Sequence, residues 1–221
     1  GPLTMVLPVR ELVPRRTTAG LDTVAVRCPK TAVTRALIRR ARVPIAAPSA
    51  NLSGKPSTTT AQHVLHDYGT DGKIDAVIDG GPCEVGVEST IVDLTGERPR
   101  LLRPGGVTPE ELTEVLGELD VDKAVLGLIS NDAVVSAPGM KYKHYAPKAD
   151  MVVIEGQRDK VKKEIERLKG LNERLGNKVG VILFEEKAFI EAAHDFFARL
   201  RELDKENVDL ILAGALSDID G

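Results

Sequence analysis

Strands and helices alternate along the last third of the chain, and this alternation constrains the fold more than any other feature. Five segments carry it: apolar, strand-like runs at 151–154, 179–184 and 208–213, separated by charged, helix-periodic segments at 159–175 and 186–203. Strands separated by helices form parallel sheets with right-handed crossovers. We therefore expect a Rossmann-like parallel domain over residues 150–221. Neither a GxGxxG nor a Walker A pattern follows these strands, so nothing supports nucleotide binding in this half.

The earlier part of the chain predicts further strands and one arginine-rich helix. The strands are expected at 5–9, 23–27, 76–79, 85–93 and 98–103. The helix is expected at 31–42, with Val33, Leu37 and Ile38 facing inward. Its arginines, Arg35, Arg39, Arg40 and Arg42, would face outward, either as a solvated face or as an RNA contact.

Between these segments, residues 44–57 combine a short apolar run with small polar residues, a glycine and prolines. The pattern predicts a buried strand that enters a loop. If the loop is extended, Ser49, Asn51 and Ser53 project to one face. Hydroxyls and an amide can bind a polyanion or a sugar, although an ordinary surface loop has the same composition.

Two threonines have the spacing of helix caps. Thr59 precedes Gln62 by three residues, as in a capping box, so we expect a helix from there to about Tyr68. Thr108 stands before Pro109 and a Glu-rich first turn, which predicts an N-cap. Arg103 lies just ahead of this Gly-rich turn and helix N-terminus, where an anion could bind.

Charge and cysteine content narrow the classes of function. Residues 150–221 hold 12 Lys and Arg against 16 Asp and Glu, whereas the remainder holds 18 against 17 and better suits an anionic ligand. The net charge of −3 and the 3% aromatic content are unlike a generic nucleic-acid binder. Cys28 and Cys83 are expected as buried free thiols in a reducing cytosol, and no metal-ligand spacing occurs. No apolar run is long enough to span a membrane.

Residues 136–148 form a Pro-bracketed segment with three lysines, a histidine and two tyrosines. An interdomain tether is one interpretation. A tether does not require this concentration of cations and tyrosines, so we interpret the segment as a binding element.

Several motifs in one order resemble the YrdC/Sua5 family. They are Gly1-Pro2-Leu3-Thr4, Leu21-Asp22-Thr23-Val24-Ala25-Val26-Arg27, Pro48-Ser49-Ala50-Asn51-Leu52-Ser53-Gly54, Glu88-Ser89-Thr90 and Arg103-Pro104-Gly105. The segment at 138–147 resembles the two-domain Sua5 type. The resemblance implies a YrdC-like twisted α/β sheet domain at 1–134, a linker at 135–149 that covers the active site, and a smaller Rossmann-like Sua5 domain at 150–221. Family members carry a further stretch before Gly-Pro-Leu-Thr and continue past Gly221, so we expect a portion of a longer protein.

The resemblance implies a cytoplasmic L-threonylcarbamoyladenylate synthase, which converts L-threonine, bicarbonate and ATP to threonylcarbamoyl-AMP and pyrophosphate for the t6A modification of tRNA. Mg²⁺ would accompany ATP, other t6A-pathway proteins would be partners, and direct tRNA contact is left open. A non-catalytic RNA-binding module is the alternative. No side chain is expected as nucleophile or base, and no metal ligand is expected.

The implied site residues fall into two groups. The threonine-binding residues would be Arg27, Ser49 and Ser89, with Arg27 pairing the substrate carboxylate. The ATP-binding residues would be Thr23, Asn51, Ser53, Thr59, Arg103, Lys141, Lys143, His144 and Tyr145. For Thr59, the ATP-binding and helix-capping interpretations are both open.

Overall fold

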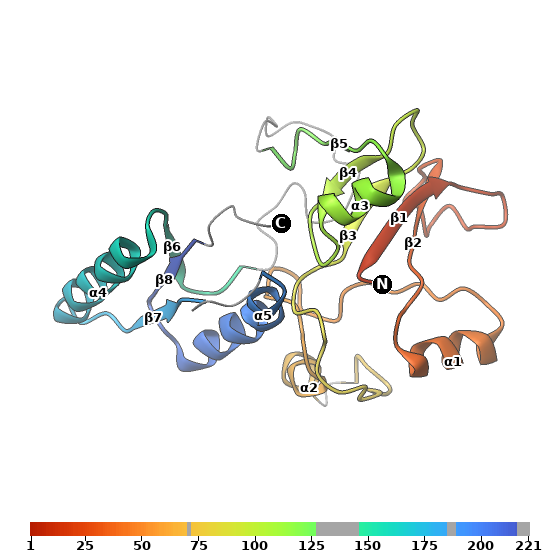
Figure 1. The fold of residues 1–221 in the computed structure, drawn as a ribbon. Coiled ribbons are helices and arrows are strands. Elements are labelled where there is room, and N and C mark those ends of the chain that lie inside the picture. Colours follow the sequence, from red (N-terminus) through yellow and green to blue (C-terminus); the bar gives the residue numbers. More distant parts are fainter. Residues whose placement is uncertain (70–71, 127–145, 185–188, 216–221) are drawn as a thin grey trace. The chain divides into compact units, whose positions relative to one another are not determined.

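The computed structural model describes residues 1–69, 72–126, 146–184 and 189–215 (Figure 1). The chain forms two compact units, each built from two separate stretches. Unit 1 contains residues 1–49 and 87–143, and unit 2 contains residues 50–86 and 144–221. The expected linker at 135–149 falls largely outside the described residues, so the division at 134 and 149 stays a prediction. Each unit is described by itself.

Unit 1 is built on a mixed five-stranded sheet. Its strands are β1 (Leu3–Pro8), β2 (Thr23–Val26), β3 (Thr90–Asp93), β4 (Arg100–Arg103) and β5 (Asp120–Val121), in the order β2-β1-β3-β4-β5. The β1–β2 and β3–β4 pairs are antiparallel, whereas β1–β3 and β4–β5 are parallel. The strand predicted at 85–93 forms only over its last four residues, as β3. Before it, the backbone carbonyls bond outside the sheet ladder: that of Glu88 accepts from the Gly106 amide, and that of Ser89 accepts from the Arg103 side chain.

The core of unit 1 lies on the central strands β1, β3 and β4. Val6, Ile91 and Leu102 form one buried cluster. Thr90 is fully buried beside them, and its hydroxyl donates to the Val107 carbonyl at 2.6 Å and accepts from the Val107 amide at 2.9 Å. A buried hydroxyl needs such partners, and here they fasten the loop after β4 to the strand β3.

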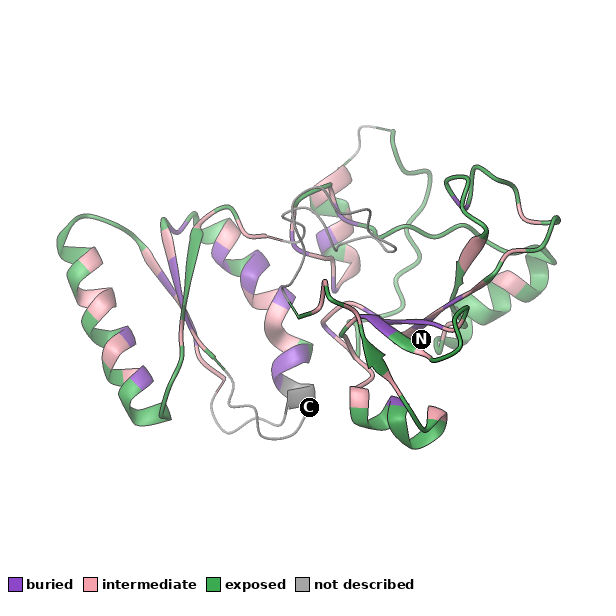
Figure 2. Cartoon of the chain, turned by 90° about the horizontal axis from the view of Figure 1, so that it is seen from above, coloured by how far each residue is buried: buried purple, intermediate pink, exposed green. Residues whose placement is uncertain are grey.

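Both helices of unit 1 form where the sequence predicted them, but only one of them has the predicted contacts. The capping box at Thr108 is confirmed at the start of α3 (Pro109–Leu116), with Thr108 and Glu111 bonding each other's backbone amides. α1 (Ala32–Ala41) forms where it was expected. The inward face expected for Val33 and Leu37 is wrong, since both are exposed, Ile38 is only partly buried and α1 has no buried residue (Figure 2). Apolar spacing reports only an amphipathic helix, not the presence of a partner.

Unit 2 contains the expected parallel sheet, with β8 (Leu210–Gly214) between β6 (Asp150–Ile154) and β7 (Val179–Ile182). α4 (Arg158–Arg174) and α5 (Phe189–Glu206) lie on opposite faces of this sheet in both views (Figures 1 and 2). Leu212 packs against Val161 and Ile165 of α4. The Leu203 side chain of α5 lies directly over Gly180, where a Cβ atom would be 2.7 Å from it.

Residues 50–86 add one helix, α2 (Ala61–Tyr68), to unit 2. The strand expected at 76–79 and the buried strand expected at the start of the 44–57 segment are wrong, because neither segment forms a strand. Val77 and Ile78 are exposed, and no described strand lies beside them to complete a hydrogen-bonded ladder. Cys28 and Cys83 are free thiols, but both are exposed rather than buried.

Candidate functional site

In unit 1, strand ends bring a buried pair of hydroxyls next to an arginine. The antiparallel pairing of Met5 with Val26 places Arg27, which follows β2, beside Thr4. The Arg27 Nε donates to Thr4 Oγ1 at 2.9 Å, and its terminal nitrogen donates to Ser89 Oγ at 2.7 Å. The two hydroxyl oxygens are 2.9 Å apart, and both residues are buried. Arg27 is therefore held by two hydrogen bonds although its side chain reaches solvent.

A second arginine reaches the same serine from β4. Arg103 donates to the Ser89 carbonyl at 2.9 and 3.2 Å and to Ser89 Oγ at 3.2 Å. Glu88 lies 3.7 Å from this guanidinium and balances part of its charge. Arg27 makes no ion pair with any carboxylate of the described residues. Two guanidinium groups that meet at one hydroxyl form a place where a carboxylate or phosphate binds favourably.

Gly105 allows the loop after β4 to reach Ser89. A Cβ atom on Gly105 would lie 2.3 Å from the Glu88 carbonyl oxygen and 2.5 Å from the Thr90 amide nitrogen. Both neighbours are backbone atoms, so they cannot rotate away. The hydrogen bond from Gly106 to the Glu88 carbonyl, 3.1 Å long, fixes this approach.

We expect Gly105→Ala to destabilise unit 1 by about 1–3 kcal/mol, the usual effect of forcing extra volume into a packed site. The displaced Ser89 should also weaken anion binding by the two arginines. Urea unfolding and threonine titration measure the two effects. Gly96→Ala is the matched control, because a Cβ there meets its nearest neighbour at an ordinary 3.6 Å. Equal behaviour of the two variants would contradict the close approach.

Thr23, a further predicted site residue of unit 1, lies apart from this cluster. Thr23 is paired with Pro8 at the opposite end of β2 from Arg27, roughly 13 Å away at the rise of a strand. Ser49 and Ser53 are exposed, whereas Asn51 is buried. The common face expected for these three side chains required an extended loop, and that condition is not met. The chain is not extended there, because Lys55 closes a turn onto Leu52.

Asn51 in unit 2 is buried, yet one of its polar atoms lacks a partner. Its Nδ2 donates to the carbonyls of Leu52 and Lys55, each at 3.0 Å, and Tyr68 donates to its backbone carbonyl at 2.9 Å. These two amide donations fix the orientation of the side chain. Its Oδ1 is buried and accepts no hydrogen bond from any described residue. Such an oxygen requires a donor, which a bound ligand could supply.

Thr59 does not cap α2. The N-cap is Thr60, whose hydroxyl accepts from the His63 amide at 3.3 Å, so the cap predicted at Thr59 is wrong by one residue. Thr59 instead contacts His63 Nδ1, with its amide nitrogen and its hydroxyl each 3.3 Å from that atom. Because the amide donates, Nδ1 accepts and carries no proton in this arrangement. Burial, and then the charges of Arg201 and Lys205, lower the pKa of His63.

This lowered pKa predicts a pH dependence. The unfolded chain takes up a proton on His63 near its ordinary pKa of about 6.5, and the folded chain does so only at lower pH. The stability of unit 2 should therefore fall as the pH drops below about 6.5. Thermal melts between pH 7.5 and 5.5 test this, with His63→Gln as the control that removes the proton. Identical slopes in parent and variant would contradict the assignment.

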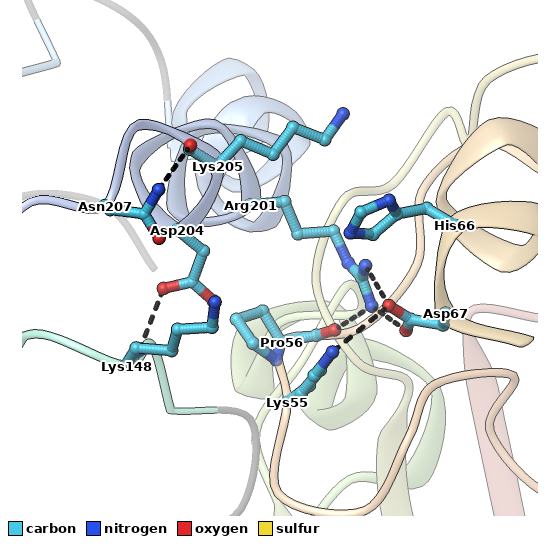
Figure 3. A pocket seen from close by; sticks show the side chains of 9 residues that line it. All are labelled: Lys55, Pro56, His66, Asp67, Lys148, Arg201, Asp204, Lys205 and Asn207. Carbon is cyan, nitrogen blue, oxygen red and sulfur yellow. Dashed lines mark hydrogen bonds and ion pairs between the residues drawn. The ribbon is translucent and has the colours of Figure 1, made fainter.

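A buried ion pair of unit 2 joins α2 to α5. Arg201 donates to both carboxylate oxygens of Asp67, at 2.6 and 3.1 Å, and the two side chains are 6% and 1% exposed (Figure 3). Burial raises the pKa of Asp67, but the hydrogen bond and charge of Arg201 outweigh this and hold that pKa below its usual value. No local sequence pattern predicts this pair, because its members are 134 residues apart. A cavity of about 260 Å³ lies beside them, lined also by Lys55, His66 and Lys148 (Figure 3).

The remaining predicted residues, Lys141, Lys143, His144 and Tyr145, lie outside the described residues. Within the described ranges, no group of three or more His, Cys, Asp or Glu side chains could hold a metal ion. No helix in those ranges is both long and apolar enough to cross a membrane.

Two family models match the sequence. The family described as "Telomere recombination" (Sua5_yciO_yrdC) matches residues 1–105. The family described as "Threonylcarbamoyl-AMP synthase, C-terminal domain" (Sua5_C) matches residues 107–220.

Individual relatives agree with these matches. The chain is 48% identical to the threonylcarbamoyl-AMP synthase of Pyrococcus abyssi, over 99% of its own length and 66% of that protein. It is 41% identical to the Bacillus subtilis protein of the same name, over 99% of its own length and 65% of that protein. The crystal structure of P. abyssi Sua5 complexed with L-threonine superposes with a TM-score of 0.90, at 49% identity, over 99% of this chain and 66% of that one. The chain thus spans just under two thirds of these relatives.

Proposed function

Because this chain belongs to the Sua5/YrdC family, we propose that it acts in threonylcarbamoyl-AMP synthesis from L-threonine, bicarbonate and ATP, with release of pyrophosphate. One observation carries the proposal: Arg27 and Arg103 meet at the buried Ser89 hydroxyl. This arrangement suits a small substrate that carries a carboxylate. The threonine complex of the P. abyssi relative supports the same class of ligand.

In this proposal, Arg27 binds the threonine carboxylate. Its Nε and one terminal nitrogen already donate to Thr4 and Ser89, so the guanidinium is fixed before the substrate arrives. A fixed fork loses little entropy on binding, which favours affinity. Ser89 Oγ accepts from both guanidinium groups and shares one proton with Thr4 Oγ1, which leaves one hydroxyl proton of this pair for a substrate oxygen. Ser49 is proposed to complete the threonine site.

The reaction needs positioning more than a reactive side chain. The threonine amine combines with bicarbonate to give a carbamate and water. A carbamate oxygen then bonds to the ATP α-phosphorus while the bond to pyrophosphate breaks. Charge neutralisation and in-line placement lower the barrier of such phosphoryl-type transfers. Arg103 is the described cation best placed to neutralise phosphate near the threonine carboxylate.

We assign the remaining ATP contacts to Thr23, Asn51, Ser53 and Thr59, together with the segment that contains Lys141, Lys143, His144 and Tyr145. The orphan Oδ1 of Asn51 supports its role, because a ribose hydroxyl or the adenine amino group would supply the missing donor. Thr60 and not Thr59 caps α2, so helix capping does not compete with ATP binding at Thr59, whose hydroxyl also contacts His63 Nδ1. Mg²⁺ is proposed to arrive with the ATP phosphates.

The product is proposed to serve t6A modification of tRNA in the cytoplasm, together with other proteins of that pathway. The arginines of α1 are exposed, as an RNA contact would require, but so are its apolar residues. Exposure of the arginines together with Val33 and Leu37 does not favour the RNA-binding alternative.

A substrate-omission assay tests the proposed function. The natural full-length protein should release pyrophosphate from ATP only when threonine and bicarbonate are both present. The P. abyssi relative serves as the positive control. Pyrophosphate release that is indifferent to threonine would contradict the proposal.

A further inference from the structure

The Arg201 side chain directs each of its four hydrogen bonds in the described structure toward residues 50–86. Besides its two bonds to Asp67, it donates to the Pro56 carbonyl at 2.6 Å and to the Ser57 carbonyl at 2.9 Å. It lies on α5 and is only 5% exposed. Figure 3 shows its guanidinium between Pro56 and Asp67. A residue of the parallel α/β part thus holds the backbone that follows the Asn51 loop.

The contacts continue from Asp67 to Asn51. Asp67 Oδ2 accepts from the Leu52 amide at 3.5 Å, and Lys55 Nζ lies 3.9 Å from Oδ1 of the same carboxylate. Leu52 and Lys55 are the two residues whose carbonyls bind the Asn51 side-chain amide. Two chains of contacts therefore connect Arg201 to the Asn51 loop, one through the Asp67 carboxylate and one through the Pro56 carbonyl.

We propose that Arg201 is a positioning residue that presents Asn51 and Thr59 to ATP, so that the C-terminal parallel sheet takes part in nucleotide binding. The inference rests on the proposed function of those two residues. The inference goes beyond the proposed function because it assigns a role in nucleotide binding to the C-terminal part of the chain, where the sequence shows no nucleotide-binding motif.

Stability alone does not explain an arginine here. Arg201 is flanked by Leu200 and lies near Leu203, both almost completely buried. A well-packed apolar residue at such a position is often as stabilising as a buried ion pair. What an apolar residue lacks is four directed donors. Two of those bonds fix carbonyls of a loop that has no strand or helix of its own between Asn51 and Thr60, and the other two fix the Asp67 carboxylate on α2.

Arg201→Lys tests the inference in the natural full-length protein. Lysine retains the charge beside Asp67 but cannot supply the fork that reaches both carbonyls. We expect the dissociation constant for ATP to rise about tenfold, as is typical of coupling between separated sites. The dissociation constant for threonine should stay unchanged, because Arg27 and Ser89 belong to unit 1. Calorimetric titration measures both constants, and circular dichroism confirms that the variant is folded.

Hydrogen exchange supplies a second readout that needs no ligand. The amides of Lys55 and Thr59 are hydrogen-bonded in the parent and should exchange faster in Arg201→Lys. Arg199→Lys is the matched control, since Arg199 lies on the same helix and pairs only with surface glutamates among the described residues. It should alter neither readout.

The outcomes separate the two hypotheses. If the parent binds ATP and Arg201→Lys binds it equally well, the positioning role is overturned while the proposed function survives. Equal losses for ATP and threonine would indicate general damage and would also overturn it. If the parent binds neither ligand, the proposed function fails, and the inference fails with it.

Discussion

Threonine binding should weaken about a hundredfold in Arg27→Ala, while ATP binding changes little. The variant loses a charge-assisted, two-pronged contact to the carboxylate, worth about 3 kcal/mol. It also leaves the buried hydroxyls of Thr4 and Ser89 without the guanidinium that orders them. Calorimetric titration of each substrate into the natural full-length protein measures the two affinities separately.

Two further variants sharpen this prediction. Arg27→Lys keeps the charge but not the fork, and we expect an intermediate loss. Arg35→Ala removes an exposed arginine of α1 in the same unit and should change neither affinity. Parallel losses for threonine and ATP in Arg27→Ala would contradict the assignment of Arg27 to the carboxylate.

Asp67→Ala should destabilise unit 2 by about 3–5 kcal/mol. The substitution strands the Arg201 charge in a site where that side chain is 6% exposed, and a buried charge without its partner is strongly unfavourable. Urea unfolding followed by circular dichroism measures the loss. Glu202→Ala is the control, because Glu202 pairs with Arg199 at the surface of the same unit and contributes little there.

The same pair predicts an acid limit for unit 2. The folded pKa of Asp67 lies below its unfolded value, so the stabilisation is complete above the ordinary carboxyl pKa of about 4 and is lost as the pH falls through the folded value. Asp67→Asn should unfold with a weaker dependence on acid pH than the parent does. An unchanged acid profile in that variant would show that other carboxylates control the transition.

The features that the sequence predicts correctly depend mostly on residues close together in the chain. The cap at Thr108 and the parallel sheet of unit 2 depend on spacing within a few residues, or on simple alternation of strands and helices. Arg27 and Ser89 were assigned together only through the family resemblance. The structure brings them together because Thr4 of β1 lies between their two strands.

What could not be predicted depends on distant partners. Nothing near Asp67 or Arg201 in the sequence indicates that their side chains form an ion pair. The helix cap is at Thr60 rather than at Thr59, whose hydroxyl contacts His63 instead. The apolar residues of α1 and the run at 76–79 had the pattern of buried elements but no neighbour to bury them. An amphipathic pattern predicts an element more readily than it predicts the surface against which that element packs.

The central claim is that threonine, bicarbonate and ATP are joined in one product. The most direct test incubates the natural full-length protein with threonine, ATP and ¹³C-labelled bicarbonate and identifies the nucleotide product by mass spectrometry. We predict a threonylcarbamoyl-AMP whose carbamoyl carbon carries the label and which is lost in Arg27→Ala. A nucleotide product that contains no carbon from bicarbonate, or that forms without threonine, would contradict the account.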